Sequence, residues 1–536
     1  MNFREFVVEH ENVIKPLKKK IALAHWNGSI TGAKRYFDDL SRLRFHLEEV
    51  YAAREDFTFV ERVRASGDFE NRLLSRIGDI LYLRYLGRQT DLSFLAGITK
   101  LSSGLERKFN LFRAEFNGMK LSRNDVSDIL LTERNSRKRQ LVWESHKRVG
   151  ELIEEDLIRL VELRNEAAAM AGFDNFYSMS LYLNEQDEGN LVELFDRLER
   201  VTREPFRAVK DELDGRTAQL YGITEDQVMP WHYEDLYFQE LPGLFSMNFD
   251  KYYSGTMPAE IAAEFYDSIG MNVSDILVRS DLYEREGKSP HAFCTDIDRA
   301  GDIRVLCNIK DNAKWTDTIL HELGHAVYDK YVSGSLPYLL RIYPNICLTE
   351  ASAIFFGGLA RDPLWMKSAL DLSVKEVEKI SSKAGRAIRA RLLVFARWCQ
   401  VMFRFERELY RNPRGDLNAI WWNIVREYQF ITPPPRRDMP DWATKIHIVT
   451  SPVYYHNYML GELIAAQFRN YIENNIIDGT SGKKGSIYGN KDVSQFFIDS
   501  VYSSGNRVSW NELIENATGE PLKVDYLMSY LREEKS

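Results

Sequence analysis

Residues 316–331, TDTILHELGHAVYDKY, place two histidines four positions apart with a glutamate beside the first. Apolar side chains recur in steps of four through the same region: Trp315, Ile319, Leu323, Val327 and Tyr331. Residues four apart lie on one face of a helix, so this stripe predicts a helix packed into the core. His321 and His325 then share another face, from which both imidazoles can reach one metal ion.

The order His-Glu-x-x-His is typical of hydrolytic zinc sites, in which the histidines bind the ion and the glutamate is a general base. Glu322 is that glutamate here. With 10 histidines and 79 acidic residues in 536 positions, chance gives the pattern below roughly 0.03 times per chain. The alternative is a pair of core histidines bonded to the backbone.

A hydrolytic zinc site also needs a third protein ligand and one position left for water. Position 331 is a tyrosine, which excludes the pattern with a third histidine six residues after the second. The next candidate is Glu350, and Thr349 before it has the residue type of an N-cap. We therefore expect Glu350 in the first turn of a following helix.

The composition limits the class of protein. A net charge of −8 is modest for 536 residues, so a nucleic-acid partner has no electrostatic support. No apolar run approaches the roughly 18 residues of a membrane span, and the N-terminal stretch has charged residues where a signal peptide would be apolar. The 4 cysteines lack C-x-x-C spacing, so we expect reduced thiols. These observations predict a soluble, cytoplasmic protein with no membrane partner.

Helical periodicity dominates the chain and predicts an all-α fold. We expect helices over residues 37–51, 156–172, 191–213, 374–410 and 464–477. Two short extended segments in residues 289–309, around a turn at 299–302, predict a β-hairpin just before the His-Glu motif. The stretch GTSGKKGSIYGNKD, residues 479–492, predicts a surface loop.

Seven stretches of the chain together carry a resemblance to a known family: AHWNGSITG (24–32), LRNEAAAMAGF (163–173), PHAFCTDIDRAGDIRV (290–305), HELGH (321–325), TEASA (349–353), WWNIVREYQFITPPPRR (421–437) and KIHIVTSPVYYHNY (445–458). In this order they resemble the angiotensin-converting enzyme family of zinc peptidyl-dipeptidases, and more distantly the oligopeptidases of the same fold. The resemblance implies a helical ellipsoid with a deep substrate channel and a small β-hairpin beside the zinc site. It treats residues 1–536 as one catalytic unit of two helical halves, with helices of about residues 1–120 as a lid.

The resemblance also assigns the metal site and the peptide-binding hairpin. It implies one zinc ion per chain with three protein ligands: His321, His325 and Glu350. Glu322 matches the general base of the family. His291 matches a substrate-contacting histidine, and with Ala292 it would meet an extended peptide by strand addition. The sequence pattern alone, without the family resemblance, predicts that His291 is a histidine in a turn.

The stretch KIHIVTSPVYYHNY matches the part of the family site that binds the peptide end and the reacting carbonyl. The resemblance places Lys445 and Tyr455 at the C-terminal carboxylate, and His447 and Tyr458 at the carbonyl. The residue types suit these roles, since an ammonium pairs with a carboxylate and a phenol or imidazole donates to an oxyanion. Without the family, tyrosines clustered in this way are core packing.

Four positions depart from the family pattern. Asn457 and Val425 stand where chloride-activated members have arginines. Ile354 stands where many members have an aspartate that orients a zinc-bound histidine, so either another group orients it or the metal affinity is lower. The family's glutamine at the substrate carboxylate has no clear counterpart near residues 229–235, MPWHYED.

The sequence thus predicts a zinc metallopeptidase that acts on short, unstructured peptides and releases C-terminal dipeptides. An oligoendopeptidase that cuts internally is the main alternative, because the glutamine is missing. A metal-free peptide-binding homologue and a helical scaffold are the alternatives from other classes. The oligomeric state is left open.

Overall fold

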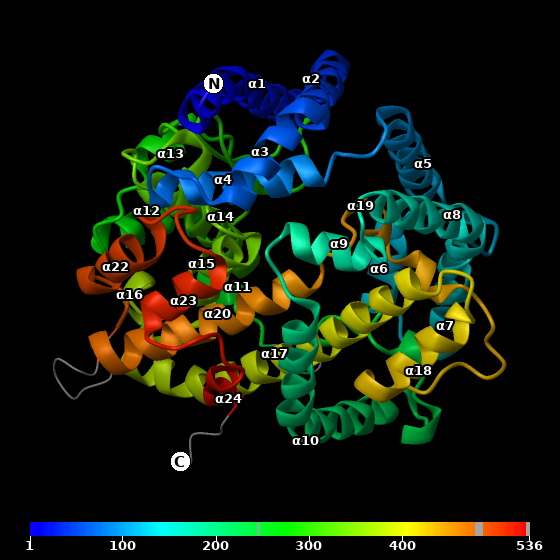
Figure 1. Cartoon of the computed structure of the whole chain (residues 1–536). Helices are drawn as coiled ribbons and strands as arrows, with labels where there is room; N and C mark the ends of the chain where they lie inside the picture. The colour runs from blue at the N-terminus through cyan, green and yellow to red at the C-terminus, as the bar shows by residue number, and fades with distance from the viewer. Residues whose placement is uncertain (244, 246, 478–485, 532–536) are drawn as a thin grey trace. The chain divides into compact units, whose positions relative to one another are not determined.

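The computed structural model of the chain describes residues 1–243, 245, 247–477 and 486–531 (Figure 1). Helices dominate, and the strands of the described residues form two small antiparallel sheets of two strands each. The predicted all-α fold with a small hairpin is therefore confirmed. Residues 479–485 of the predicted surface loop lie outside the described residues.

The chain divides into two compact units. The first contains Met1–Gln89, Asn248–Ala384 and Leu460–Tyr530, and the second contains Thr90–Met247 and Gly385–Met459. Helix α17 (Val374–Arg411) begins in the first unit and ends in the second, whereas α20 (His456–Ile472) begins in the second and ends in the first. Both units are thus built from separate stretches of the chain.

The first unit holds the N-terminal helices, the helices around the His-Glu motif and the C-terminal helices. Its other regular elements are α1 (Phe3–Thr31), α2 (Lys34–Ala52), α3 (Arg54–Ser66), α4 (Arg72–Leu86), α11 (Asp250–Tyr253), α12 (Pro258–Ser268), α13 (Ser274–Arg279), β3 (Phe293–Asp296), β4 (Ile303–Leu306), α14 (Ala313–Tyr331), α15 (Ile346–Gly358), α16 (Pro363–Ala369), α22 (Lys491–Phe496), α23 (Trp510–Thr518) and α24 (Asp525–Leu531). Two π-helical turns, Glu473–Ile477 and Phe497–Tyr502, follow α20 and α22.

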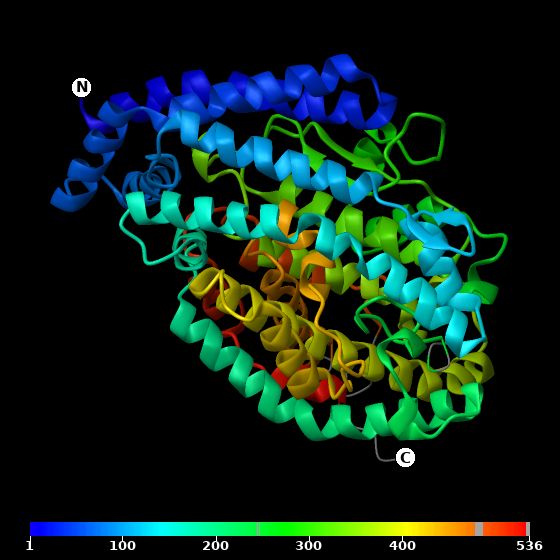
Figure 2. The ribbon, with the colours of Figure 1, turned by 90° about the vertical axis from the view of Figure 1, so that its right-hand side faces the viewer.

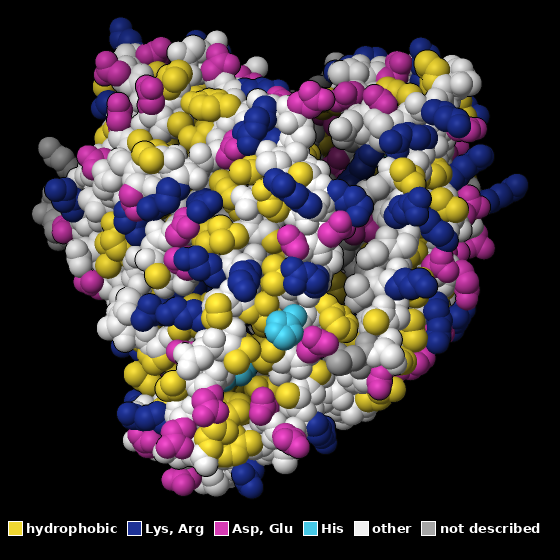
Figure 3. Space-filling view, turned by 90° about the horizontal axis from the view of Figure 1, so that it is seen from above, with side chains coloured by type: hydrophobic (Ala, Val, Ile, Leu, Met, Phe, Trp, Pro, Cys, Tyr) yellow, Lys and Arg dark blue, Asp and Glu magenta, His cyan; other side chains and the backbone are white. Residues whose placement is uncertain are grey.

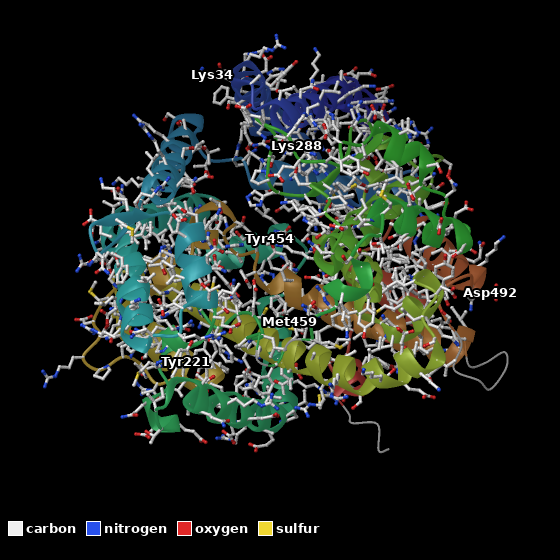
Figure 4. The ribbon with its side chains drawn as sticks, turned by 180° about the vertical axis from the view of Figure 1, so that it is seen from behind. Lys34, Tyr221, Lys288, Tyr454, Met459 and Asp492 are labelled. Atoms are coloured by element: carbon white, nitrogen blue, oxygen red, sulfur yellow. The ribbon has the colours of Figure 1, made fainter. Side chains whose placement is uncertain are left out.

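The second unit contains longer helices and a short hairpin. Its elements besides α17 and α20 are α5 (Leu92–Leu111), β1 (Ala114–Phe116), β2 (Met119–Leu121), α6 (Arg123–Thr132), α7 (Ser136–Lys147), α8 (Val149–Met170), α9 (Phe176–Leu183), α10 (Glu188–Tyr221), α18 (Leu417–Gln429) and α19 (His447–Thr450). Tyr221 at the end of α10 is labelled in Figure 4, and Gly222 after it closes the helix in the left-handed conformation.

The five helices predicted from periodicity are present as α2, α8, α10, α17 and α20. Helix α10 is longer than predicted at both ends. It begins after Asp187, whose side chain accepts a hydrogen bond from the backbone of Asn190. The predicted last helix begins earlier, at His456, and its final residues form a π-helical turn. The helical spacing of apolar residues thus predicted where the helices lie, while local caps and turns determine where they begin and end.

The predicted hairpin is confirmed as β3 and β4, paired from Phe293↔Leu306 to Asp296↔Ile303. Helix α1, which runs beside α2 in Figure 2, covers it. Trp26 of α1 packs in a buried cluster with Ile297 and Leu306, and Lys19 pairs with Asp298 of the turn at 3.0 Å. The hairpin therefore has a fixed support.

The loop that leads into this hairpin is organised by a buried lysine, Lys288, which is labelled in Figure 4. Its ammonium donates to the backbone carbonyls of Asp281 at 3.0 Å and Tyr283 at 2.8 Å. It also pairs with the Asp281 carboxylate at 2.8 Å. These bonds give hydrogen-bond donors to backbone carbonyls that have no partner strand or helix in the irregular loop.

A second hairpin, β1–β2, was not predicted. Its turn residues are Asn117 and Gly118, both with positive φ, at 50° and 76°. An Asn-Gly pair between short extended segments favours this tight turn, so the sequence did contain the signal.

The structure also bears on the surface charge, the membrane spans and the thiols. Figure 3 shows basic and acidic side chains interspersed over one face of the protein. No helix among the described residues is long and apolar enough to cross a membrane. All four cysteines are free, and Cys307, Cys347 and Cys399 are buried.

Candidate active site

The crossing of α14 and α15 in the first unit brings the His-Glu motif to Glu350. The two backbones approach closely at Gly324, where a Cβ atom in place of hydrogen would lie 2.8 Å from the Cα of Ala353. The hydroxyl of Ser352 on α15 donates to the Gly324 carbonyl at 2.9 Å. Of the predicted apolar stripe on α14, the three central residues are fully buried. Small residues and the buried stripe therefore set the distance between the helices.

Three side chains that could hold a metal ion converge at this crossing. One ligand atom each from His321, His325 and Glu350 lie within 4.8 Å of one another, and His321 Nε2 is 3.9 Å from a Glu350 oxygen. Burial lowers the pKa of both histidines, although Asp317 and a backbone hydrogen bond with Ala353 oppose this at His321. The imidazoles are therefore neutral, as metal ligands must be. Two imidazoles and one carboxylate form a donor set that fits zinc.

The predicted N-cap is wrong. Helix α15 begins after Asn345, whose side chain accepts from the backbone of Cys347, so Glu350 lies in the second turn and Thr349 lies inside the helix. Thr349 is buried, and its hydroxyl is 2.7 Å from Nδ1 of His325. This bond leaves Nε2 of His325 for a metal ion. Thr349 thus supplies the orienting contact that the isoleucine at position 354 does not.

Glu322 lies beside the ligands and is only 8% exposed. Burial and the charge of Glu350 raise the pKa of Glu322 to about 8, and a hydrogen bond from the backbone N–H of Cys294 on β3 opposes the rise. A divalent cation at the three ligands would lower this pKa again. The carboxylate can therefore accept a proton near neutral pH.

The hairpin residues lie in the same unit. His291 is exposed, and Ala292, directly before β3, is half-buried. Strand β3 contacts α14 and pairs with β4 along one edge, while no other strand in the described part of the chain pairs with its second edge. This edge offers backbone groups that an extended peptide can use.

The other predicted site residues, Lys445, His447, Tyr455 and Tyr458, belong to the second unit. Aromatic rings and one glutamine surround the ammonium of Lys445. Lys445 is 3% exposed, and its ammonium lies 5.0–5.1 Å from the ring centres of Tyr237, Trp398 and Tyr455. It donates to the side-chain oxygen of Gln239 at 2.7 Å. Burial and the charge of Arg123 lower the pKa of Lys445 to about 7.

Gln239 was not predicted from the sequence, because it follows the stretch 229–235 in which a glutamine was expected. Its loop is held by Asp235, whose carboxylate accepts from the backbone N–H groups of Tyr237 at 2.7 Å and Gln239 at 3.0 Å. Phe238 between them has a φ of 52°, a strained conformation for a bulky residue. The Gln429 amide donates to the Phe238 carbonyl at 2.8 Å and holds this conformation.

His447, Tyr455 and Tyr458 lie in one aromatic row. The ring centres of His447 and Tyr455 are 5.3 Å apart, as are those of Tyr455 and Tyr458. The segment between His447 and Tyr455 is strained at Val453, with a φ of 51°. Its N–H donates at 2.6 Å to the buried carboxylate of Glu406, which therefore fixes the segment.

The two positions at which family arginines are replaced are both buried. Asn457 is 4% exposed and accepts from the Gln186 amide at 2.7 Å. Val425 lines a small apolar cavity between aromatic side chains. Arg426 beside it is exposed.

Comparisons with known proteins agree with this arrangement. The family model described as "Angiotensin-converting enzyme" matches residues 217–533, which include every residue discussed in this section except Arg123 and Gln186. The chain therefore belongs to the angiotensin-converting enzyme family, a family of peptidases. It is also 23% identical to Carboxypeptidase 1 of Bacillus subtilis (strain 168) over 276 residues, 47% of this chain and 54% of that protein. The match thus spans about half the length of this relative.

Proposed function

We propose that the protein is a zinc-dependent metallopeptidase that hydrolyses short, unstructured peptides. The observation that carries the proposal is the convergence of His321, His325 and Glu350 with Glu322 beside them. The chemistry that one zinc ion supplies when bound is activation of a water molecule and polarisation of the peptide carbonyl. The family resemblance implies that the site lies in a deep channel, and such a channel would exclude folded proteins.

Glu322 is the general base in this proposal. Its carboxylate takes the proton from the attacking water and then passes it to the leaving amine. The backbone N–H of Cys294, on the neighbouring strand, favours the charged form of this carboxylate. The exposed His291 and half-buried Ala292 bind the peptide backbone at the edge of β3.

His447 and Tyr458 donate hydrogen bonds to the oxyanion. Burial and the charges of Lys445 and Arg123 lower the pKa of His447 to about 4, so its ring is neutral and offers one N–H. The Tyr458 hydroxyl is the second donor. That both residues act on the same peptide as Glu322 is taken from the family resemblance.

The C-terminal carboxylate of the peptide binds to Lys445 and Tyr455, and we assign Gln239 to the same clamp. A glutamine beside Lys445 supports release of C-terminal dipeptides over internal cleavage. The relative from Bacillus subtilis carries the name carboxypeptidase, which agrees with action at this end of a chain.

The experiment that tests this proposal is mass spectrometry of the products from one decapeptide, free and C-terminally amidated, with and without a chelator. We expect dipeptides from the free peptide, much slower cleavage of the amidated one, and no cleavage with chelator. Equal internal cutting of both peptides would contradict the clamp and support an oligoendopeptidase.

Glu322→Gln separates catalysis from metal binding. We expect this variant to keep one zinc ion per chain by elemental analysis and to lose nearly all turnover, since the ligands remain and the base is gone. Turnover near the wild-type rate would refute the assigned base. Wild-type protein that binds peptide without zinc or cleavage would be the metal-free homologue.

A further inference from the structure

A cavity of about 190 Å³ opens in the second unit where the ends of four helices meet. Its lining comes from the end of α5, the segment after it, the start of α6, the end of α7 and the start of α8: Phe109, Asn110, Phe112, Arg113, Ser122, Arg123, Asn124, His146 and Val149. It has room for a group much larger than a water molecule.

Two arginines, Arg113 and Arg123, line this cavity and give it a positive charge. Arg113 donates to the backbone carbonyls of Asn110 and Phe112, both at 2.8 Å, and Arg123 lies over the Phe109 ring at 5.9 Å. Neither guanidinium forms an ion pair with a carboxylate in the described part of the chain. The Asp125 carboxylate, on the first turn of α6, accepts from the backbone and hydroxyl of Ser122, each at 2.7 Å. These bonds and the charge of Arg113 lower the pKa of Asp125, so this carboxylate offsets part of the positive charge.

A buried histidine lines the same cavity. His146 is 4% exposed, and its buried Nε2 has no hydrogen-bond partner among the residues that the structure describes. Burial lowers the pKa of His146 to about 3, so the neutral ring has one N–H to donate. The first turn of α6 adds backbone N–H groups without helical partners and the positive end of the helix dipole. All of these groups favour an anion.

The charge of the cavity acts on residues that are proposed to bind the substrate. The charge of Arg123 contributes to the lowered pKa of both Lys445 and His447. In addition, α5 contacts α19, the helix that begins with His447, and Ser102 of α5 donates to the Val449 carbonyl at 3.4 Å. An anion between Arg113 and Arg123 would therefore lie on the same side of the unit as the carboxylate clamp.

From this geometry we propose that the cavity is a subsite for the side-chain carboxylate of an acidic residue at the C-terminal end of the substrate. The inference rests on the proposed peptidase function and adds a substrate class to it. Arg123 and Arg113 bind the carboxylate, and His146 donates one further hydrogen bond. Peptides that end in, or next to, aspartate or glutamate are the preferred substrates.

The test compares peptides that differ by one charge, with Glu or Gln at the last or the preceding position. We expect wild-type kcat/KM to favour Glu at one of these positions by about 5-fold, the upper range for an exposed ion pair. Arg123→Gln and Arg113→Gln should reduce the ratio of kcat/KM for the Glu peptide to kcat/KM for the Gln peptide to about one, and Arg123→Lys should retain part of this preference. Arg426→Gln, which removes an exposed arginine elsewhere in this unit, is the matched control and should keep the full preference.

Calorimetric binding of the same peptides to Glu322→Gln makes the result independent of turnover. If the protein cleaves no peptide but still binds Glu peptides more tightly through Arg123, the subsite stands and the proposed catalysis fails. Equal kcat/KM and equal affinity for Glu and Gln peptides at both positions would overturn the subsite, as would a preference unchanged in Arg123→Gln. Inorganic phosphate is the second arm: binding of phosphate that requires Arg123 but leaves the Glu preference intact would show a free-anion site instead.

Discussion

Replacing Thr349 with valine tests whether this hydroxyl orients His325, a proposed zinc ligand. Valine has nearly the same shape, so Thr349→Val removes the 2.7 Å contact with Nδ1 of His325 and little packing. Thr349 is 2% exposed, so water cannot easily replace the lost partner. The N–H on Nδ1 then has no acceptor when Nε2 faces the metal.

The expected effect follows from the kind of partner that is lost. A buried donor without an acceptor costs about 1–3 kcal/mol, and partners of metal-binding histidines are worth about 10- to 100-fold in metal affinity. A neutral hydroxyl polarises the ring less than a carboxylate does. We therefore expect zinc affinity to fall about 10-fold, or about 1.4 kcal/mol.

The assay is competition for zinc with a chelator of known affinity, which needs no turnover. Thr349→Ser keeps the hydroxyl and should stay near the wild-type dissociation constant. Thr316→Val is the matched control, because Thr316 is also fully buried and its hydroxyl donates to a backbone carbonyl, that of Asn312, at 3.1 Å. An unchanged zinc dissociation constant in Thr349→Val would refute the orienting role.

Three further predictions concern anions, pH and packing. Replacing chloride by acetate at constant ionic strength should leave the cleavage rate unchanged, because Asn457 and Val425 supply no cation; a several-fold rise with chloride would contradict this. The pKa of Lys445 is lowered to about 7, so the ammonium is present below that pH and lost above it. KM for peptides with a free carboxylate should therefore rise as pH increases through 7 in wild type but not in Lys445→Met, and equal profiles would refute the clamp. Gly324→Ala should lower stability by about 1–3 kcal/mol, measured as Tm, because its Cβ meets the backbone of α15, whereas Gly334→Ala, in open space, should change little.

The parts of the site that follow helical spacing could be predicted from the sequence. His321, Glu322 and His325 share one helix, so their relation depends on local geometry alone. The hairpin was also predictable, because two short extended segments and the turn between them lie next to each other in the chain. For β1–β2 the same kind of signal is present at Asn117, although this hairpin was not predicted.

Contacts between distant segments could not be predicted in this way. Gln239 meets Lys445 across 206 positions, and its loop depends on Asp235 and on strain at Phe238. Thr349 was misread because a threonine before a helix favours a cap, while Asn345 is the residue that the tertiary structure selects. Local propensity could not decide between two residues that both suit the role.

The packing of α1 on the hairpin has a consequence for shortened forms of the protein. Trp26 is 3% exposed because Ile297 and Leu306 lie against it. A chain lacking residues 1–31 would therefore uncover an apolar face on the strands beside Glu322, even though the deleted segment contains none of the proposed catalytic residues. A tag, a truncation or a binding partner that shifted α1 would therefore also shift the strand edge that is proposed to bind the peptide.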